Sequence, residues 1–148
     1  MFCVCLMVSA QVRASASCSL ISAGTLNFGN YDPFSTRDTE STTSLTIRCT
    51  GTGRVSYQIQ LSTGSSGNYS ARTMTLQNAV DNELLYNLYT NSKRRKVWGD
   101  GTRGTKVIKK SKKNNFSKTH SVYGQIPALQ TSVMAGNYSD TIIATLIY

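Results

Sequence analysis

NYSDTIIATLIY, residues 137–148, is the stretch that decides the fold class. Its second half places an apolar residue at every even position, and these residues are Ile142, Ala144, Leu146 and Tyr148. Successive side chains of a β-strand point to opposite faces, so this period of two predicts a strand whose even row faces a core. A strand this apolar normally has a neighbour on each side, and no sequence follows it here to supply one. We therefore expect a sheet that is one strand short at its C-terminal end.

The same alternation recurs between turn signals earlier in the chain. Residues 43–50 (TSLTIRCT) and 54–62 (RVSYQIQLS) place apolar side chains at odd positions, and GTG at 51–53 connects them as a hairpin. Further strands are expected at 72–76, 84–89 and 121–126, around Val97 and around Val107. A chain of 148 residues is long enough for a single core. Ser, Thr, Gly, Asn and Tyr are frequent between short apolar runs, a composition that favours strands over helices. The sequence predicts one all-β domain built as a sandwich.

Basic residues are concentrated in one segment. Eleven of the 16 Lys and Arg, and one acid, Asp100, fall between residues 93 and 118. This segment therefore has a net charge of +10, whereas the whole chain has +9, so the rest of the chain is close to neutral. Only Trp98 and Phe116 are aromatic there, which argues against stacking on nucleic-acid bases. We expect a solvated basic loop with a secondary capacity for weak attachment to anionic surfaces. The lysines that we assign to this attachment are Lys106, Lys109, Lys110, Lys112 and Lys113.

The cysteines divide by position, since Cys3 and Cys5 lie near the start and Cys18 and Cys49 lie in the body of the chain. Two body cysteines in a chain with export features indicate one disulfide, with two free buried thiols as the alternative. No other cluster of Cys or His completes a metal site around the first pair.

Residues with catalytic chemistry are few and scattered. His120 is the only histidine, and no serine or cysteine motif accompanies it. The acidic residues form no recognisable pair, and no Gly-rich phosphate loop is present. The longest apolar run, residues 2–8, is far shorter than the roughly 20 residues that cross a bilayer. We expect no enzymatic activity, no cofactor and no transmembrane segment.

Four blocks together resemble the spore coat protein U domain family, the subunits of archaic chaperone-usher pili. They are LNFGNYDP at 26–33, YNLYTNSKRRKVWGDGTRGT at 86–105, YGQIPA at 123–128 and AGNYSDTIIATLIY at 135–148. The resemblance covers residues 17–148, and Cys18 and Cys49 fall where that family places its disulfide. Residues 106–118, KVIKKSKKNNFSK, depart from the Gly, Ser and Thr-rich loop that is usual in relatives.

The resemblance implies an incomplete immunoglobulin-like β-sandwich, residues 18–148, that lacks its last strand and is completed by a donated one. In such subunits a periplasmic chaperone lends a strand first, and a neighbouring subunit then inserts its N-terminal extension at an outer-membrane usher. Ile142, Ala144, Leu146 and Tyr148 would then line the acceptor groove and bind the chaperone strand. The alternative is that they are ordinary core residues of a complete sandwich.

Residues 1–17, MFCVCLMVSAQVRASAS, allow two interpretations. A short apolar run before Ala14-Ser15-Ala16 is typical of a signal peptide, but no Lys or Arg precedes the run. A donor-strand extension fits better, because an apolar row occupies the even positions. That row is Phe2, Val4, Leu6, Val8, Ala10 and Val12. On this interpretation the true start and signal peptide lie upstream of Met1.

Two functions remain open at this point. The first is a structural subunit of a secreted surface fibre, exported through the periplasm and polymerised by strand donation, which supports adhesion and biofilm formation. The second is a stand-alone secreted module that attaches to anionic surfaces or polysaccharide through the basic loop. Neither involves nucleic acid.

Overall fold

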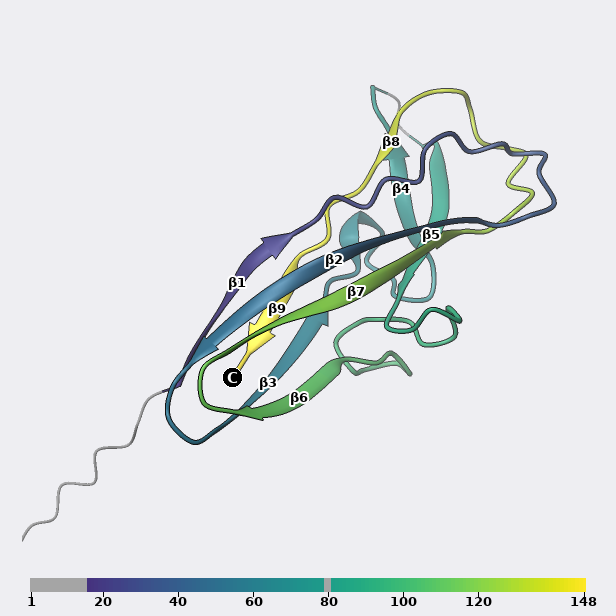
Figure 1. Ribbon diagram of the computed structural model, residues 1–148. Coiled ribbons are helices and arrows are strands. Elements are labelled where there is room, and N and C mark those ends of the chain that lie inside the picture. The colour runs from purple at the N-terminus through teal and green to yellow at the C-terminus, as the bar shows by residue number, and fades with distance from the viewer. Residues whose placement is uncertain (1–15, 79–80) are drawn as a thin grey trace, which may run out of the picture.

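The computed structural model describes residues 16–78 and 81–148, and this part of the chain is built from β-strands without an α-helix (Figure 1). The strands are β1 (Ser17–Ala23), β2 (Thr39–Thr50), β3 (Arg54–Leu61), β4 (Arg72–Leu76), β5 (Glu83–Tyr89), β6 (Ile108–Lys113), β7 (Phe116–Ile126), β8 (Tyr138–Ser139) and β9 (Ala144–Ile147). One 3₁₀ turn, η1 (Gly64–Ser66), follows β3. The prediction of an all-β domain is confirmed.

The strands form two antiparallel sheets. The larger has the order β1-β2-β7-β5-β4-β8, and the smaller has the order β6-β3-β9. The predicted strand 43–50 lies within β2, and the predicted strand 54–62 extends one residue beyond the end of β3. Both bury the odd rows that the sequence indicated. The sheets pack face to face, so the apolar rows of the two strands meet in one core.

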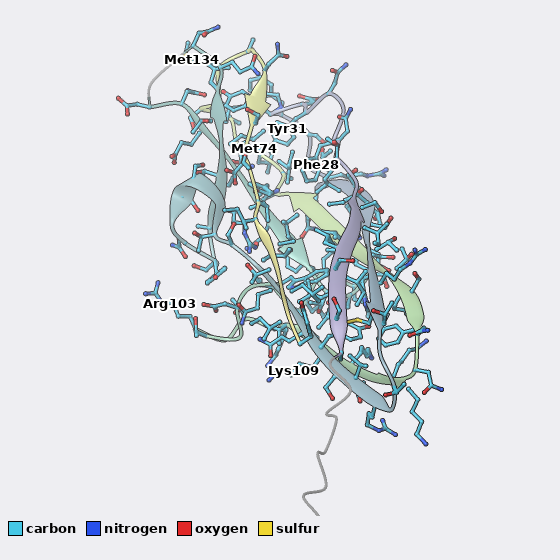
Figure 2. All side chains as sticks on the ribbon, turned by 90° about the vertical axis from the view of Figure 1, so that its left-hand side faces the viewer. Phe28, Tyr31, Met74, Arg103, Lys109 and Met134 are labelled. Atoms are coloured by element: carbon cyan, nitrogen blue, oxygen red, sulfur yellow. A yellow bond between two sulfur atoms is a disulfide. The ribbon has the colours of Figure 1, made fainter. Side chains whose placement is uncertain are left out.

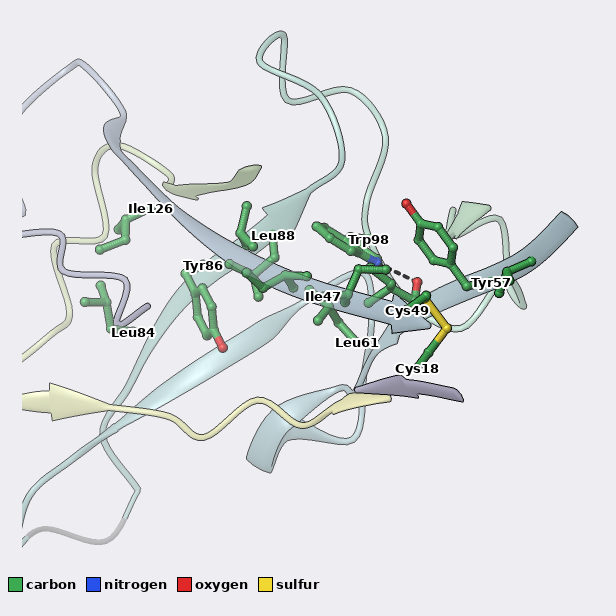
Figure 3. Close-up of a cluster of buried hydrophobic side chains, with 14 residues drawn as sticks. Cys18, Ile47, Cys49, Tyr57, Leu61, Leu84, Tyr86, Leu88, Trp98 and Ile126 are labelled. Carbon is green, nitrogen blue, oxygen red and sulfur yellow. Dashed lines mark hydrogen bonds between the residues drawn. A yellow bond between two sulfur atoms is a disulfide. The ribbon is translucent and has the colours of Figure 1, made fainter. Parts of the chain in front are cut away.

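Fully buried side chains hold the two sheets together (Figure 3). Trp98 lies between them with no exposed surface, and its indole Nε1–H donates a hydrogen bond of 3.0 Å to the carbonyl of Ile59. The strand expected around Val97 is only an isolated bridge between Tyr89 and Val97. Trp98 therefore belongs to a loop that is buried by its side chain rather than to a strand.

The predicted disulfide is confirmed. Cys18 and Cys49 are bonded and stand opposite each other in the register of β1 and β2, both on the core face. The bond closes a separation of 31 residues along the chain. In the chain-entropy description, a closure of this length stabilises a fold by roughly 3–4 kcal/mol. It fixes β1, which has no other strand partner in the described residues.

The prediction of a basic loop is wrong for most of its lysines. Residues Ile108–Lys113 form strand β6, which pairs with β3 and continues through a tight turn into β7. Asn114 adopts a φ of 61° in that turn, a conformation that Asn tolerates better than most residues. The strand expected around Val107 begins one residue later, at Ile108. The lysine-rich sequence concealed its length because β6 is an edge strand whose long side chains reach water from either face.

The C-terminal segment is two short strands rather than one. β8 pairs with β4 in the larger sheet, whereas β9 pairs with β3 in the smaller sheet. The chain therefore crosses from one sheet to the other between Ser139 and Ala144. This crossing places the end of the chain alongside β1 (Figure 1).

Candidate functional site

One side of the sandwich is open between two unpaired strand edges. β1 is an edge of the larger sheet and β9 is an edge of the smaller one, and among the described residues no strand joins them. Figure 2 looks onto this side, with β1 and the C-terminal segment running next to each other. Leu20 and Ile21 of β1 keep 39% and 52% of their surface exposed, although both are large and apolar. An edge with free backbone groups and exposed apolar side chains is a template for a further strand.

A hollow of about 450 Å³ lies at this open side, between residues 23–28 and residues 138–144. Side chains of both sheets form its apolar floor: Leu45, Leu61, Met74, Tyr86, Leu88 and Val122. A second hollow of about 660 Å³ continues it toward residues 133–137 and shares Leu26, Phe28 and Met74 with the first. The two hollows adjoin at these residues, and we call them together the β1–β9 groove.

Of the four apolar residues predicted to line the acceptor groove, three lie on its side of the C-terminal segment and Tyr148 does not. Ala144 and Leu146 stand opposite Leu61 and Ile59, which are buried, so their side chains point to the sandwich interior. Ile142 and Ala144 line the hollow itself and, like Leu146, are half-buried. Tyr148 is 59% exposed and does not line it. The other three apolar side chains are half-buried because they pack against the sandwich on one side and, within the described part of the chain, have no further strand over the other.

Sequence reasoning missed several groove residues. Leu26 and Phe28 come from the long β1–β2 connection and reach over Gly124 of β7, where an added Cβ would lie 2.4 Å from Leu26 Cδ2 and 2.7 Å from Phe28 Cζ. Phe28 also packs edge-on against Tyr86, with ring centroids 6.2 Å apart. No local sequence pattern identifies these residues as part of the groove lining, because they come from separate elements that meet only in the folded chain. Figure 2 shows Phe28, Tyr31 and Met74 gathered at one end of the open side.

Asp140 anchors the crossing between β8 and β9. The Tyr86 hydroxyl donates to Asp140 Oδ2 at 2.6 Å, and the Ser65 N–H donates to Asp140 Oδ1 at 2.9 Å. Ile143 then exchanges two hydrogen bonds with Ser62, each of 2.9 Å. Burial, and then the bond to the Asp140 carboxylate, raise the pKa of the Tyr86 hydroxyl well above its usual range, so it remains a donor. The groove wall is thereby held to the loop after β3.

The six predicted donor residues, Phe2, Val4, Leu6, Val8, Ala10 and Val12, lie outside the described residues. Lys106 precedes β6 and bridges to Trp98 instead. Lys109, Lys110, Lys112 and Lys113 lie on β6, at the edge of the smaller sheet opposite to β9. The structure therefore separates the basic residues from the groove.

In residues 16–78 and 81–148, no group of His, Cys, Asp and Glu is suited to hold a metal ion, and no helix is long and apolar enough to span a membrane.

His120 lies beneath β6, between the sheets. It is buried, and its Nε2 is 3.0 Å from the Tyr57 hydroxyl. Burial lowers the pKa of His120 below its ordinary value of 6.5, and the positive charges of Lys118 and Lys110 lower it further.

This environment predicts a pH-dependent stability. With a depressed folded-state pKa, the unfolded chain binds the proton more readily, so the contribution of His120 is complete about one pH unit above 6.5 and is lost as the pH falls through that value. We expect the free energy of unfolding to drop between about pH 7.5 and 5.5, and the drop to shrink in His120→Gln. Urea titrations of both chains, each with a donor strand fused behind Tyr148, measure it. Equal slopes in the two chains would contradict the assignment, because no other histidine is present.

The comparisons with known proteins agree with this architecture. A family model described as the Spore Coat Protein U domain matches residues 4–145. The chain belongs to the Spore Coat Protein U domain family. Protein U of Myxococcus xanthus is 31% identical over an aligned length of 147, and the match covers 92% of this chain and 80% of that protein. The resemblance that the four sequence blocks indicated is confirmed.

A solved structure shows the same fold. It is the crystal structure of the CsuC–CsuE chaperone-tip adhesion subunit pre-assembly complex from archaic chaperone-usher Csu pili of Acinetobacter baumannii. The TM-score is 0.60 at 20% identity, over 90% of this chain and 40% of that chain. The Spore Coat Protein U chain described here thus has the immunoglobulin-like sandwich fold of a chaperone-usher pilus subunit.

Proposed function

We propose that this chain is a structural subunit of a secreted surface fibre of the archaic chaperone-usher type, assembled by strand donation into the β1–β9 groove. The observation that carries the proposal is the apolar groove between two strand edges that have no partner in the described residues. Family membership and the likeness to a pilus subunit support it.

The groove offers an inserted strand both a backbone partner and apolar space for its side chains. Its backbone can pair with the free edge of β9, while alternate side chains enter the hollow over Leu61, Met74 and Val122. Residues 1–17 of a neighbouring copy offer a matching row, from Phe2 to Val12. A periplasmic chaperone occupies the groove before assembly, and an outer-membrane usher exchanges the two. The fibre is then exposed on the cell surface, where it supports adhesion and biofilm formation.

The test is periplasmic expression with and without the chaperone. We expect the chain alone to aggregate or be degraded, and co-expression to recover a soluble complex. Leu146→Arg, on the groove side of β9, should lower that recovery by about fivefold or more, because it places a charge among apolar side chains. Thr145→Arg is the matched control, since Thr145 stands opposite Gln60 on the outer face, and it should change recovery by less than about twofold.

Two outcomes would reject the proposal. A chain that purifies alone as a stable monomer with cooperative unfolding needs no donated strand. Equal recovery of the two arginine variants would mean that the groove face of β9 does not meet the chaperone.

A further inference from the structure

A second opening of the sandwich lies on the far side of β3 from the groove, and it is cationic. A cleft of about 470 Å³ separates β6 from β7, and its lining includes Lys109, Lys110, Lys118 and His120. Lys110 stands opposite the buried Tyr57, and Lys118 stands opposite the buried Ile47. Both lysines therefore occupy the interior-facing rows of their sheets yet remain exposed, because the sandwich is open there.

A second row of cations follows the outer face of β6. Lys109 and Lys113 point away from the core and flank Ser111, and Arg54 of β3 stands opposite Lys113. The six residues of β6 span about 20 Å at the usual rise of a strand. The positive charges are thus arranged along a line and on both faces of one strand.

Nothing in the described residues neutralises this charge. Strands β3, β6 and β7 contain neither Asp nor Glu. The ion pair found in residues 16–78 and 81–148 joins Arg94 to Glu40, on other elements. Lysine on an edge strand deters unwanted strand pairing, but that role does not account for Lys118 and Arg54, which lie on interior strands.

We propose that the β6–β7 cleft and the outer row of β6 bind a linear acidic polysaccharide, a chain of carboxylated or sulfated sugars. Charge complementarity along an extended strand suits a linear polyanion. Ser56, Ser111, Thr119 and Ser121 lie among the lysines and supply hydrogen-bond partners for sugar hydroxyls. The free edge of β6 adds backbone donors and acceptors.

A single-stranded nucleic acid fits less well. Such ligands are bound by aromatic side chains on which bases stack. Two aromatic rings lie near the lysines of this site, and a cation already covers each. Tyr123 lines the cleft beneath the Arg94 guanidinium, 5.9 Å from the ring centroid. Phe116 is half-buried against Tyr57, with the Lys112 ammonium 5.8 Å from its ring centroid. A positive strand beside hydroxyl groups, with its neighbouring rings already covered, favours sugars over bases.

The site is independent of the β1–β9 groove. β3 separates β6 from β9, so the cleft stays accessible whether or not the groove is filled. Figure 2 shows Lys109 away from Phe28, Tyr31 and Met74 at the groove. Polysaccharide binding and fibre assembly are therefore compatible properties of one chain, rather than alternatives.

The test is binding of heparin and alginate by the full chain, in whichever soluble form it takes: alone, with its chaperone, or in fibres. We expect both to bind with an affinity that falls as salt is added, and uncharged dextran not to bind. Replacing Lys109, Lys110, Lys112 and Lys113 by Gln should weaken binding at least about tenfold. The matched control replaces Lys93, Arg95, Lys96 and Arg103 by Gln, which removes the same charge from an exposed loop, and should weaken it by less than about threefold.

A second readout follows the protonation of a single group in the cleft. Because Lys110 and Lys118 lower the pKa of His120, a bound polyanion should raise the pKa of the imidazole, as measured by NMR titration, and the β6 quadruple variant should lose the rise. Equal weakening by both quadruple variants would reduce the effect to net charge and overturn the proposal. Tighter binding of a single-stranded DNA of matched charge would overturn it in favour of nucleic acid. Either result leaves assembly through the groove untouched.

Discussion

Appending a second copy of residues 2–13 behind Tyr148, through an Asn-Gly turn, will convert the chain into a stable monomer. The turn reverses the chain so that the appended segment runs antiparallel to β9 and fills the β1–β9 groove. Cys3 and Cys5 of the appended copy are replaced by Ser to avoid additional thiols. Its apolar row offers six side chains, most of them worth about 2 kcal/mol when buried, partly offset by the ordering of the segment. We expect a net gain on the order of 5 kcal/mol, or about 10–20 °C in the midpoint of thermal unfolding.

The control uses the two faces of the appended strand. Leu6→Asp with Val8→Asp in the appended copy should abolish the gain, because both side chains face the apolar floor. Met7→Asp with Ser9→Asp should retain most of it, because these positions face outward. Size-exclusion chromatography and thermal unfolding measure the outcome. Equal stabilisation by both versions would show that tethering, and not filling of the groove, is responsible.

The sequence predicted the elements in which one face is buried and the other is solvated. β2 and β3 were predicted because apolar residues alternate with polar ones, namely Leu45 and Ile47 in β2 and Val55 and Tyr57 in β3. Such alternation indicates a strand with one buried and one solvated face. A strand was expected around Val107, but the lysines of β6 were assigned to a loop, because both faces of this strand reach water and its sequence shows no alternation. The disulfide followed from two body cysteines, since only one intramolecular pair was available to them.

The groove could be predicted only in outline. Residues 142–148 indicated one wall through their own alternation, but the crossing between sheets depends on Asp140 meeting Tyr86 and Ser65, which lie far away in the sequence. The opposite wall and floor depend on Leu26, Phe28 and Met74, from elements that approach only after folding. The position of the basic residues, away from the groove, followed from sheet order, which no local pattern encodes.

Replacing Arg72 by Met will destabilise the chain by about 3–5 kcal/mol. Arg72 has no exposed surface, and its guanidinium holds three separate parts of the fold. It donates to the carbonyl of Ser62 at 2.7 Å, to the carbonyl of Trp98 at 2.7 Å and to Asn87 Oδ1 at 2.7 Å. Methionine fills a similar volume but leaves the carbonyls of Ser62 and Trp98 without their donor, and each unsatisfied group costs about 1–3 kcal/mol. Asn87 Oδ1 loses one of two donors, because it keeps the N–H of Leu88.

The effect should reach the groove because Ser62 is shared. The same residue that accepts from Arg72 also exchanges hydrogen bonds with Ile143 at the start of the β9 wall. Arg72→Lys keeps the charge but not the planar fork, so it should recover less than half of the loss. Urea unfolding of the strand-appended chain, or of the soluble chain alone, measures both variants.

Arg37 provides the comparison, because it is exposed and Arg37→Met should change the free energy of unfolding by less than about 0.5 kcal/mol. A loss below about 1 kcal/mol for Arg72→Met would show that water replaces the guanidinium at its acceptors. In that case the crossing between the sheets would depend on Asp140 rather than on Arg72, and Asp140→Ala would become the more damaging of the two substitutions.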